Sequence, residues 1–592
     1  MTDEKSWDLS PLVESTDPDK VKENLDQAVS AIKNFETKYK EQIINLDAKK
    51  VLELFKEMEK EEFRRDGTFL YARLKYTTNM TDPVARDLND HVRNANMQIR
   101  KSLAFVDLEL GQLLEKNPKM IEDPSLSNYK HLLEKIYRGL PYQLSEIEEQ
   151  LTIEKDRFGI DAWAQFQSEW LSTRTFEIEL EGKIETLPYG EIIGLYESPD
   201  RELRRKANSI VYSNLGKDHI LWAFAVRSVC SDHLMQMKRR KWPSTLSQSL
   251  ITNDVDQKTI ESLMRTVKEN APLYQRYLKL KTKIMGLPKL GNWDIVAPLP
   301  DSPKKKYSWT KAQKLVVDCY SEFDKQSGEW INEMFEKRHI DAEVRKGKQS
   351  GAWCALWISG KSAWILCSFN ELLGNVFTLA HENGHALHDY LMTRAQTPLN
   401  CRYSYCIAET GSLFGELLLI EKLLAESKTN EERKTILCYV LDRFGYVVFQ
   451  VSARYFFEQD MYNSIDNGEY LDGEKIAELW VKARDDMYGD AVEWLPEMKW
   501  EWTMKSHYYM PRFRYYNYPY VFGQLFVFAL YEKYQQEGKD FVPKIKQLLA
   551  DGGSKSPREL AADIGLDITD SKFWELGLKQ AERFIDELEK IV

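Results

Sequence analysis

The sequence predicts a mainly α-helical protein with small β-hairpins. Along most of the 592 residues, Leu, Phe and Ile recur at steps of three and four, the period of a helix with one buried face. Residues 351–366 instead alternate loosely, are rich in Trp and Ala, and carry Ser359-Gly360-Lys361 past their middle. That pattern is typical of a β-hairpin.

The elements follow in order along the chain. The first 175 residues contain successive amphipathic helices, for example 48–76 and 87–114. Residues 176–182 alternate and predict a small hairpin, while Ser198-Pro199-Asp200 predicts a helix that starts with a proline at its first position. Prolines between 286 and 306 predict an extended connection. We expect an N-terminal helical lobe at 1–190 and a second domain at 191–592.

Composition limits the partners and the compartment. The net charge of −11 is the wrong sign for a protein whose main partner is nucleic acid or an anionic membrane. Seven cysteines are scattered without CxxC spacing, and the N-terminus lacks the pattern of a signal peptide; both features favour the cytoplasm. The aromatic stretch 515–531 predicts a buried helix entered through an irregular loop rather than a membrane span. The oligomeric state is left open.

An HExxH motif, His381-Glu382-Asn383-Gly384-His385, predicts a zinc-dependent hydrolytic site. The two histidines are four residues apart, so on a helix they project from the same face and can bind one metal ion. Glu382 is rotated off the metal axis, where a carboxylate can take a proton from a metal-activated water.

The third ligand decides the class of zinc site, because a catalytic zinc keeps one of four positions open. His388 and Leu391 stand where a metzincin has a glycine and a third histidine, which excludes that class. Asp389 lies too close to the second histidine along the same helix to complete a tetrahedron comfortably. Glu409, in the helical pattern 406–424, is the next carboxylate. We predict Glu409 as the third ligand.

Glu416 lies seven residues after Glu409 and therefore on the same helical face. Because the same helix is rich in leucine, its buried side would not keep two carboxylates without a cation. We predict that Glu416 holds a ligand histidine in its tautomer; the alternative is a carboxylate at the rim or on the helix surface. His388 also faces the site, as a contact to substrate or to a ligand, with metal ligation as its alternative.

Residues 506–524 gather His507 and six tyrosines around Pro511, Arg512 and Arg514. An aromatic core segment would explain the tyrosines but not the histidine and the two arginines. We therefore favour a loop that presents phenol and imidazole donors to the oxyanion formed when water attacks a carbonyl.

Together these motifs resemble the thimet oligopeptidase and oligoendopeptidase F family of zinc metallopeptidases. The resemblance covers nearly the whole chain and depends on seven features: the sequence HENGHALH at 381–388, Thr378-Leu379-Ala380 before it, Ala408-Glu409 with Glu416, the tyrosine-rich loop after His507, Trp7-Asp8-Leu9, Gly347-Lys348 with Ser350-Gly351-Ala352, and Asp551-Gly552-Gly553-Ser554. Asn383, where the family usually has an apolar residue, and the hairpin tip 355–362 depart from the family pattern.

The resemblance implies a two-lobed, clam-like helical shell around a deep channel, with the small hairpin beside the HExxH helix. It implies an endopeptidase that cleaves short, unstructured oligopeptides, with one zinc ion per chain. His381, His385 and Glu409 would hold the zinc, and Glu382 would act as general base.

The resemblance also implies how substrate is held. The backbone of Gly351, Ala352, Trp353 and Cys354 would pair with the peptide as an added β-strand. His507 and Tyr518 would donate to the oxyanion and the substrate, with Tyr515 and Tyr508 as neighbours.

Two other functions remain open at the level of sequence. One is a helical-shell exopeptidase of the angiotensin-converting (dipeptidyl carboxypeptidase) or carboxypeptidase Taq type. The other is a peptide-binding scaffold without catalysis.

Overall fold

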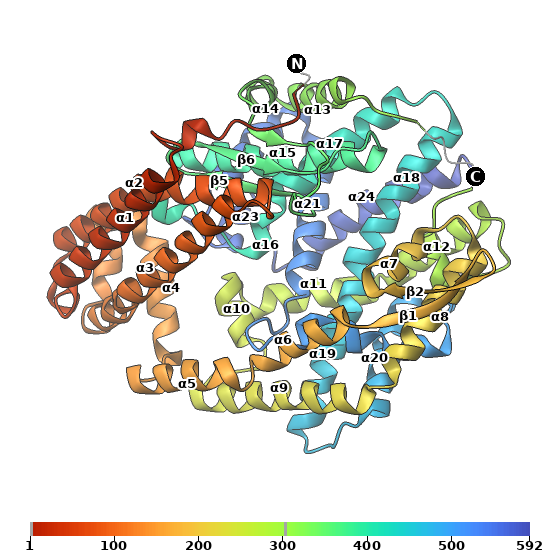
Figure 1. Ribbon diagram of the computed structural model, residues 1–592, viewed down its shortest axis with the longest axis horizontal. Helices are drawn as coiled ribbons and strands as arrows, with labels where there is room; N and C mark the ends of the chain where they lie inside the picture. The colour runs from red at the N-terminus through yellow and green to blue at the C-terminus, as the bar shows by residue number, and fades with distance from the viewer. Residues whose placement is uncertain (1–3, 301–304) are drawn as a thin grey trace. The chain divides into compact units, whose positions relative to one another are not determined.

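The computed structural model describes residues 4–300 and 305–592, most of them in helices (Figure 1). The chain forms two compact units, each assembled from three stretches of sequence. Unit 1 comprises residues 1–140, 304–425 and 533–567, and unit 2 comprises 141–303, 426–532 and 568–592. The boundary expected at residue 190 divides the chain into two continuous segments, which is a different division from these two units. That boundary stays a prediction.

Unit 1 begins with three long helices that lie side by side, α1 (Pro18–Tyr39), α2 (Ala48–Thr78) and α3 (Pro83–Lys116) (Figure 1). Each follows an aspartate whose side chain accepts a hydrogen bond from a backbone N–H of the first turn. This satisfies donors that a helix leaves unpaired. Their apolar faces form buried clusters, which confirms the helices predicted at 48–76 and 87–114. The other helices of unit 1 are α4 (Lys130–Gly139), α13 (Trp309–Phe323), α14 (Lys325–Glu336), α15 (Leu373–Ala395), α16 (Tyr405–Ala408), α17 (Thr410–Glu426), α22 (Val542–Asp551) and α23 (Pro557–Asp563).

A three-stranded sheet of unit 1 lies beside α15 (Figure 1). The hairpin predicted at 351–366 is confirmed: β5 (Trp353–Trp357) pairs antiparallel with β6 (Ser362–Leu366), with Trp353 opposite Leu366. The two-residue strand β4 (Ile340–Asp341) pairs parallel with β6. The order β4-β6-β5 leaves β5 on the edge of this sheet, while every residue of β6 is buried.

Unit 2 is also mainly helical. Its helices are α5 (Glu146–Phe158), α6 (Ala162–Ser172), α7 (Tyr189–Gly194), α8 (Arg201–Gly216), α9 (His219–Arg240), α10 (Ser247–Asn253), α11 (Gln257–Glu269), α12 (Ala271–Ile284), α18 (Asn430–Gly445), α19 (Val451–Asp466), α20 (Gly473–Tyr488), α21 (Tyr518–Glu537) and α24 (Ser571–Glu589). Two short pairs of strands accompany them: β1 (Thr175–Leu180) is antiparallel to β2 (Lys183–Pro188), and β3 (Leu290–Gly291) is parallel to β7 (Val492–Glu493). The hairpin predicted near 176–182 is thus confirmed.

The start of α8 differs from the prediction. The helix begins at Arg201 rather than after Ser198, because the Asp200 carboxylate accepts hydrogen bonds from the N–H groups of Glu202 and Leu203. Asp200 is therefore the N-cap, and Pro199 precedes the helix. In the proline-rich connection, α12 ends at Ile284, before the first proline, and residues 301–304 lie outside the described part of the chain.

One helical stretch, Asn430–Asp466, is long and apolar enough to cross a membrane by length and composition alone. It consists of α18, a π-helical turn (Tyr446–Gln450) and α19. Because 67% of its most apolar window is buried inside the protein, it has the character of a core helix. The aromatic stretch predicted to form a buried helix does so as α21. The fold class, mainly α with a small sheet beside the HExxH helix, is confirmed; the shell around a channel stays a prediction.

Candidate metal centre

The two histidines of the HExxH motif lie on one face of α15. Their ring centroids are 4.9 Å apart, and both side chains are partly exposed, at 21% for His381 and 19% for His385. The Asn375 side chain accepts hydrogen bonds from the N–H groups of Asn370 and Leu372 and closes the start of the helix. The helix is buried on most of its other positions. The sequence spacing thus places two imidazole nitrogens side by side, as predicted.

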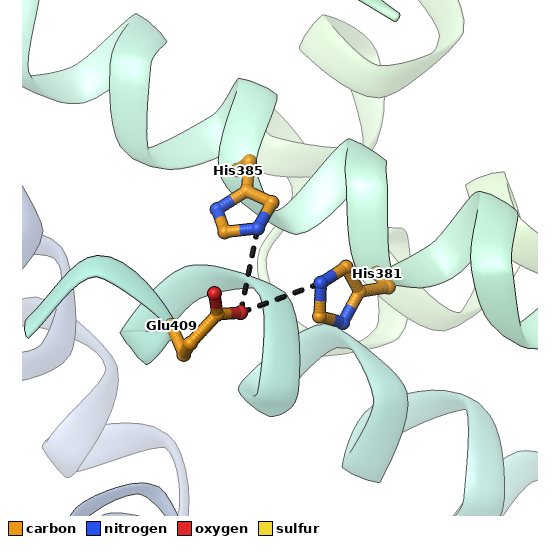
Figure 2. Close-up of side chains that lie close together, drawn as sticks. All are labelled: His381, His385 and Glu409. Atoms are coloured by element: carbon orange, nitrogen blue, oxygen red, sulfur yellow. Dashed lines mark ion pairs between the residues drawn. The ribbon is translucent and has the colours of Figure 1, made fainter. Parts of the chain in front are cut away.

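Glu409 completes a cluster of three possible metal ligands (Figure 2). It lies at the break between α16 and α17, and its Oε2 is 3.3 Å from His381 Nε2 and 3.4 Å from His385 Nε2. An ion with four tetrahedral bonds of about 2.0–2.1 Å keeps its ligand atoms about 3.3–3.4 Å apart. Both distances therefore fit a single tetrahedral zinc ion.

Electrostatics support a charged carboxylate at this position. Burial raises the pKa of Glu409, but the hydrogen bond and charge of His385 outweigh burial and hold it at about 2. The Ser412 hydroxyl also donates to Glu409 Oε2 at 2.7 Å. In turn, Glu409 raises the pKa of His385 to about 9 against the opposing effect of burial. The carboxylate is thus ionised and oriented for a cation.

Glu416 lies behind the histidine pair. Its Oε1 accepts a hydrogen bond from His381 Nδ1 at 2.6 Å, and the residue is 6% exposed. A proton on Nδ1 leaves the lone pair of Nε2 free to face a metal. The role expected for Glu416 stays a prediction, which this hydrogen bond and the burial of Glu416 favour over the surface alternative.

Close packing between α15 and α17 sets these distances. A Cβ added to Gly384 would lie 2.2 Å from the carbonyl oxygen of Gly411, and one added to Gly411 would lie 2.3 Å from that of Gly384. Next to this crossing, the Tyr320 hydroxyl donates to the Ala380 carbonyl at 2.8 Å, in space that a side chain at Gly415 would fill. Only glycine lets the two backbones approach this closely, and the approach brings Glu409 to the histidines.

Glu382 is 5% exposed and lies in the same cavity as the three possible ligands. Its Oε2 has no hydrogen-bond partner among the described residues. Burial raises the pKa of Glu382, opposed by the two neighbouring histidines. A buried carboxylate with a raised pKa and a free oxygen is suited to proton transfer.

A cavity of about 550 Å³ joins these groups to the hairpin. Ala352, Trp353 and Cys354 line it, as expected for residues predicted to contact substrate; Gly351, with a φ of 92°, lies just before them. The cavity also receives side chains that sequence reasoning did not assign to the site: Leu356, Asp389, Cys401, Arg402, Tyr403 and Ala408. Residues 401–403 belong to a loop without periodic pattern, so the sequence carried no signal for them.

His388 is fully buried, and its ring stacks on that of Tyr403 at 4.3 Å. Neither ring nitrogen has a hydrogen-bond partner within the described part of the chain, and burial lowers the pKa of His388 to about 3. His388 is not grouped with the three possible ligands. Its contact with substrate stays a prediction; its neighbour Tyr403 is the group that reaches the cavity.

The residues predicted as oxyanion and substrate donors lie in unit 2. Tyr508, Tyr515 and Tyr518 are at most 1% exposed. The Tyr518 hydroxyl contacts Asn253 Nδ2 at 3.1 Å and donates to the Ser249 carbonyl at 3.2 Å. Burial raises the pKa of both Tyr508 and Tyr515 well above 10.

A buried ion pair shapes this loop. Arg514, with no exposed side-chain surface, lies 3.6 Å from Glu458 and donates to the carbonyls of His507 and Tyr508. Glu458 accepts a hydrogen bond from the N–H of Tyr515, whose φ is 54°. His507 is partly exposed, and burial lowers its pKa to about 4, so its imidazole is neutral at pH 7. The catalytic roles of His507, Tyr515 and Tyr518 stay predictions.

Comparisons with known proteins show the family of this chain. Residues 195–580 match the model of peptidase family M3, and residues 115–176 match that of Oligopeptidase F. The chain is 27% identical over 556 residues to Group B oligopeptidase PepB of Streptococcus agalactiae, covering 92% of this chain and 91% of that protein. It is also 27% identical to a plasmid-encoded oligoendopeptidase F of Lactococcus lactis, covering 88% and 87% of the two chains.

Solved structures share the fold. A protein from Chlamydophila abortus superposes with a TM-score of 0.89 at 22% identity, covering 100% of this chain and 99% of the other. The oligoendopeptidase F of Enterococcus faecium gives 0.71 at 22% identity, covering 97% and 98%. The family model that matches residues 195–580, more than half of the chain, confirms the resemblance drawn from the motifs: the chain belongs to peptidase family M3.

Proposed function

We propose that this protein is a zinc-dependent endopeptidase that hydrolyses internal bonds of short, unstructured oligopeptides. The observation that carries the proposal is the tetrahedral spacing of His381, His385 and Glu409 in one cavity with Glu382. The names of the relatives, oligopeptidase and oligoendopeptidase F, favour the same activity.

The donor set favours zinc. Two imidazole nitrogens and one carboxylate are typical of a catalytic site that keeps one position for water or substrate. Bound there, one zinc ion would polarise the scissile carbonyl and lower the pKa of water. Glu416 would keep His381 in the tautomer that the metal needs.

Glu382 would act as the general base. Its free Oε2 would accept the proton of the attacking water, and the carboxylic acid so formed would return that proton to the amine of the leaving peptide. The pKa of Glu382, raised by burial, moves toward neutrality, where one group can both take and give a proton.

The edge of the sheet would hold the substrate. Because β5 is an edge strand, its outer backbone groups can pair with an extended peptide laid across the cavity. Ala352, Trp353 and Cys354 would then align the scissile bond with the metal centre. A folded protein offers no free extended segment of this kind, which restricts the enzyme to unstructured peptides.

His507 and Tyr518 would stabilise the oxyanion, with Tyr515 and Tyr508 beside them. The hydrogen bonds of Arg514 and Glu458 support this role, because they fix the backbone of the loop in one conformation. We place the enzyme in the cytoplasm, since all seven cysteines are free thiols. Its partners would be peptides rather than nucleic acid or a membrane.

The test is cleavage of an internally quenched peptide that is blocked at both ends, by the wild type and by Glu382→Gln. We expect the wild type to cut an internal bond, and the variant to lose at least about 10³-fold in kcat while it retains zinc. An exopeptidase of the dipeptidyl carboxypeptidase or Taq type would leave the blocked peptide intact. A peptide-binding scaffold would bind it without turnover.

A further inference from the structure

Asp389 is a buried carboxylate of the cavity that the proposed mechanism does not use. It follows His385 by one helical turn on α15, is 4% exposed, and lines the same cavity as the metal centre. Among the described residues its side chain has one hydrogen-bond partner, the Cys354 thiol, with 3.9 Å between Sγ and Oδ2. A thiol is a weak donor, so this hydrogen bond does little to stabilise the buried charge. Burial raises the pKa of Asp389 to about 7, opposed by the charge of His385, and a cation on a ligand would favour the ionised form.

Among the described residues Asp389 forms no ion pair with a lysine or arginine. Glu382 and Glu409 line the same cavity and add to its negative potential. Arg402 is the cationic side chain among the described lining residues, but it is 78% exposed and lies 3.8 Å from Glu62. The charge of His385 acts on Asp389 through space, but no hydrogen bond joins these two side chains in the described part of the chain. Burying a carboxylate without a charged partner costs free energy. A ligand that brings a cation would offset that cost.

We propose that Asp389 makes this cavity a subsite for a cationic side chain, lysine or arginine, next to the scissile bond. The inference rests on the proposed peptidase function. The position next to the scissile bond follows because the metal ligands and Glu382 line the same cavity of about 550 Å³. That volume accommodates one long side chain. A serine or threonine could donate to Asp389 but would leave its charge unneutralised.

Peptide substrates that differ at one position test the proposal on the unmodified enzyme. Doubly blocked, internally quenched peptides would carry lysine, arginine, norleucine, citrulline or glutamate on either side of the scissile bond. Norleucine and citrulline match the length of lysine and arginine without the charge. We expect kcat/KM at one of the two positions to favour lysine over norleucine by about tenfold or more, and glutamate to be poorest.

Asp389→Asn links the preference to this residue. The amide keeps the size of the side chain and removes its charge, so the lysine-to-norleucine ratio should fall by about tenfold. Asp318→Asn is the matched control, because Asp318 lies on the surface of α13 in the same unit and pairs with Lys314 at 2.6 Å. The control should keep the wild-type ratio.

Binding gives a second readout without turnover. In the Glu382→Gln protein, calorimetry should show the lysine peptide binding about tenfold more tightly than the norleucine peptide, and Asp389→Asn in that background should remove the difference. Cleavage and binding of all peptides without preference for a cation would overturn the subsite and leave the peptidase intact. Cleavage of no peptide would overturn the function, and the binding difference would still decide the subsite.

Discussion

At the scale of single residues, His381 shows how the metal centre is prepared. Glu416 accepts from its Nδ1, while its Nε2 faces Glu409. The ring therefore has one orientation and one tautomer before any ion binds. Asn383, one of the two departures from the family pattern, is buried and donates to the Leu379 carbonyl at 2.8 Å. This hydrogen bond accommodates a polar side chain without disturbing the histidines on either side.

Buried histidines predict acid sensitivity. His233 is 4% exposed, and its Nε2 donates to the Thr245 carbonyl at 2.7 Å. Burial lowers its pKa to about 4, whereas the unfolded chain has a value of about 6.5. As pH falls below 6.5 the unfolded state takes up the proton first, so stability is lost progressively toward pH 4.

His233 alone should lower the free energy of unfolding by about 2 kcal/mol between pH 7 and pH 5. His233→Gln keeps a donor for the Thr245 carbonyl and takes up no proton, so it should lose less stability over that interval than the wild type. Denaturant titrations at both pH values measure this. Equal losses in the two proteins would show that His233 does not couple protonation to folding.

Residues of the candidate site could be predicted from the sequence where they stand at a helical spacing from one another. His381 and His385 are four residues apart, and Glu409 and Glu416 are seven apart. Either spacing places the two residues on one face of a helix. Ser412, which orients Glu409, and Tyr403, which covers His388, could not be found this way. A hydroxyl and a loop tyrosine have no periodic pattern, and their roles depend on contacts that only the fold creates.

At the scale of elements, the crossing of α15 and α17 at Gly384 and Gly411 controls the metal centre. Gly411→Ala would place a Cβ 2.3 Å from the Gly384 carbonyl and force the helices apart. We expect a loss of about 1–3 kcal/mol of stability and weaker zinc binding, because Glu409 lies two residues before the crossing. Thermal unfolding and a zinc titration measure the two effects.

Gly139→Ala is the control for that substitution. Gly139 ends α4 in the same unit, and a Cβ there meets no atom within 4 Å. The control should keep both the stability and the zinc affinity of the wild type. If Gly411→Ala behaved like the control, the close crossing would not determine the position of Glu409.

Elements with a strong local period could be predicted, and those without one could not. The hairpin at 353–366 and the long helices followed from their patterns. Strand β4 has two residues and pairs with β6 in parallel, so no alternation exists to reveal it. The start of α8 was misplaced because Ser198 and Asp200 are both good caps, and only the structure shows that Asp200 accepts the first-turn hydrogen bonds.

At the scale of the whole molecule, each compact unit gathers three distant segments of chain. Hydrophobic periodicity reports which face of an element is buried, not which segments bury it together. For this reason the sequence could indicate a helical N-terminal lobe but not that residues 1–140 share a unit with the HExxH helix. The three possible ligands, the hairpin and Asp389 all belong to unit 1.

The most direct test of the metal centre is the zinc stoichiometry and affinity of the purified protein and of Glu409→Ala. We expect one zinc ion per chain in the wild type. A chelator should remove the zinc and the peptidase activity together, and added zinc should restore the activity. Glu409→Ala should bind zinc at least about 100-fold more weakly, while Glu336→Ala on the surface of α14 should match the wild type. Wild-type zinc affinity and stoichiometry in Glu409→Ala would contradict the three-ligand site.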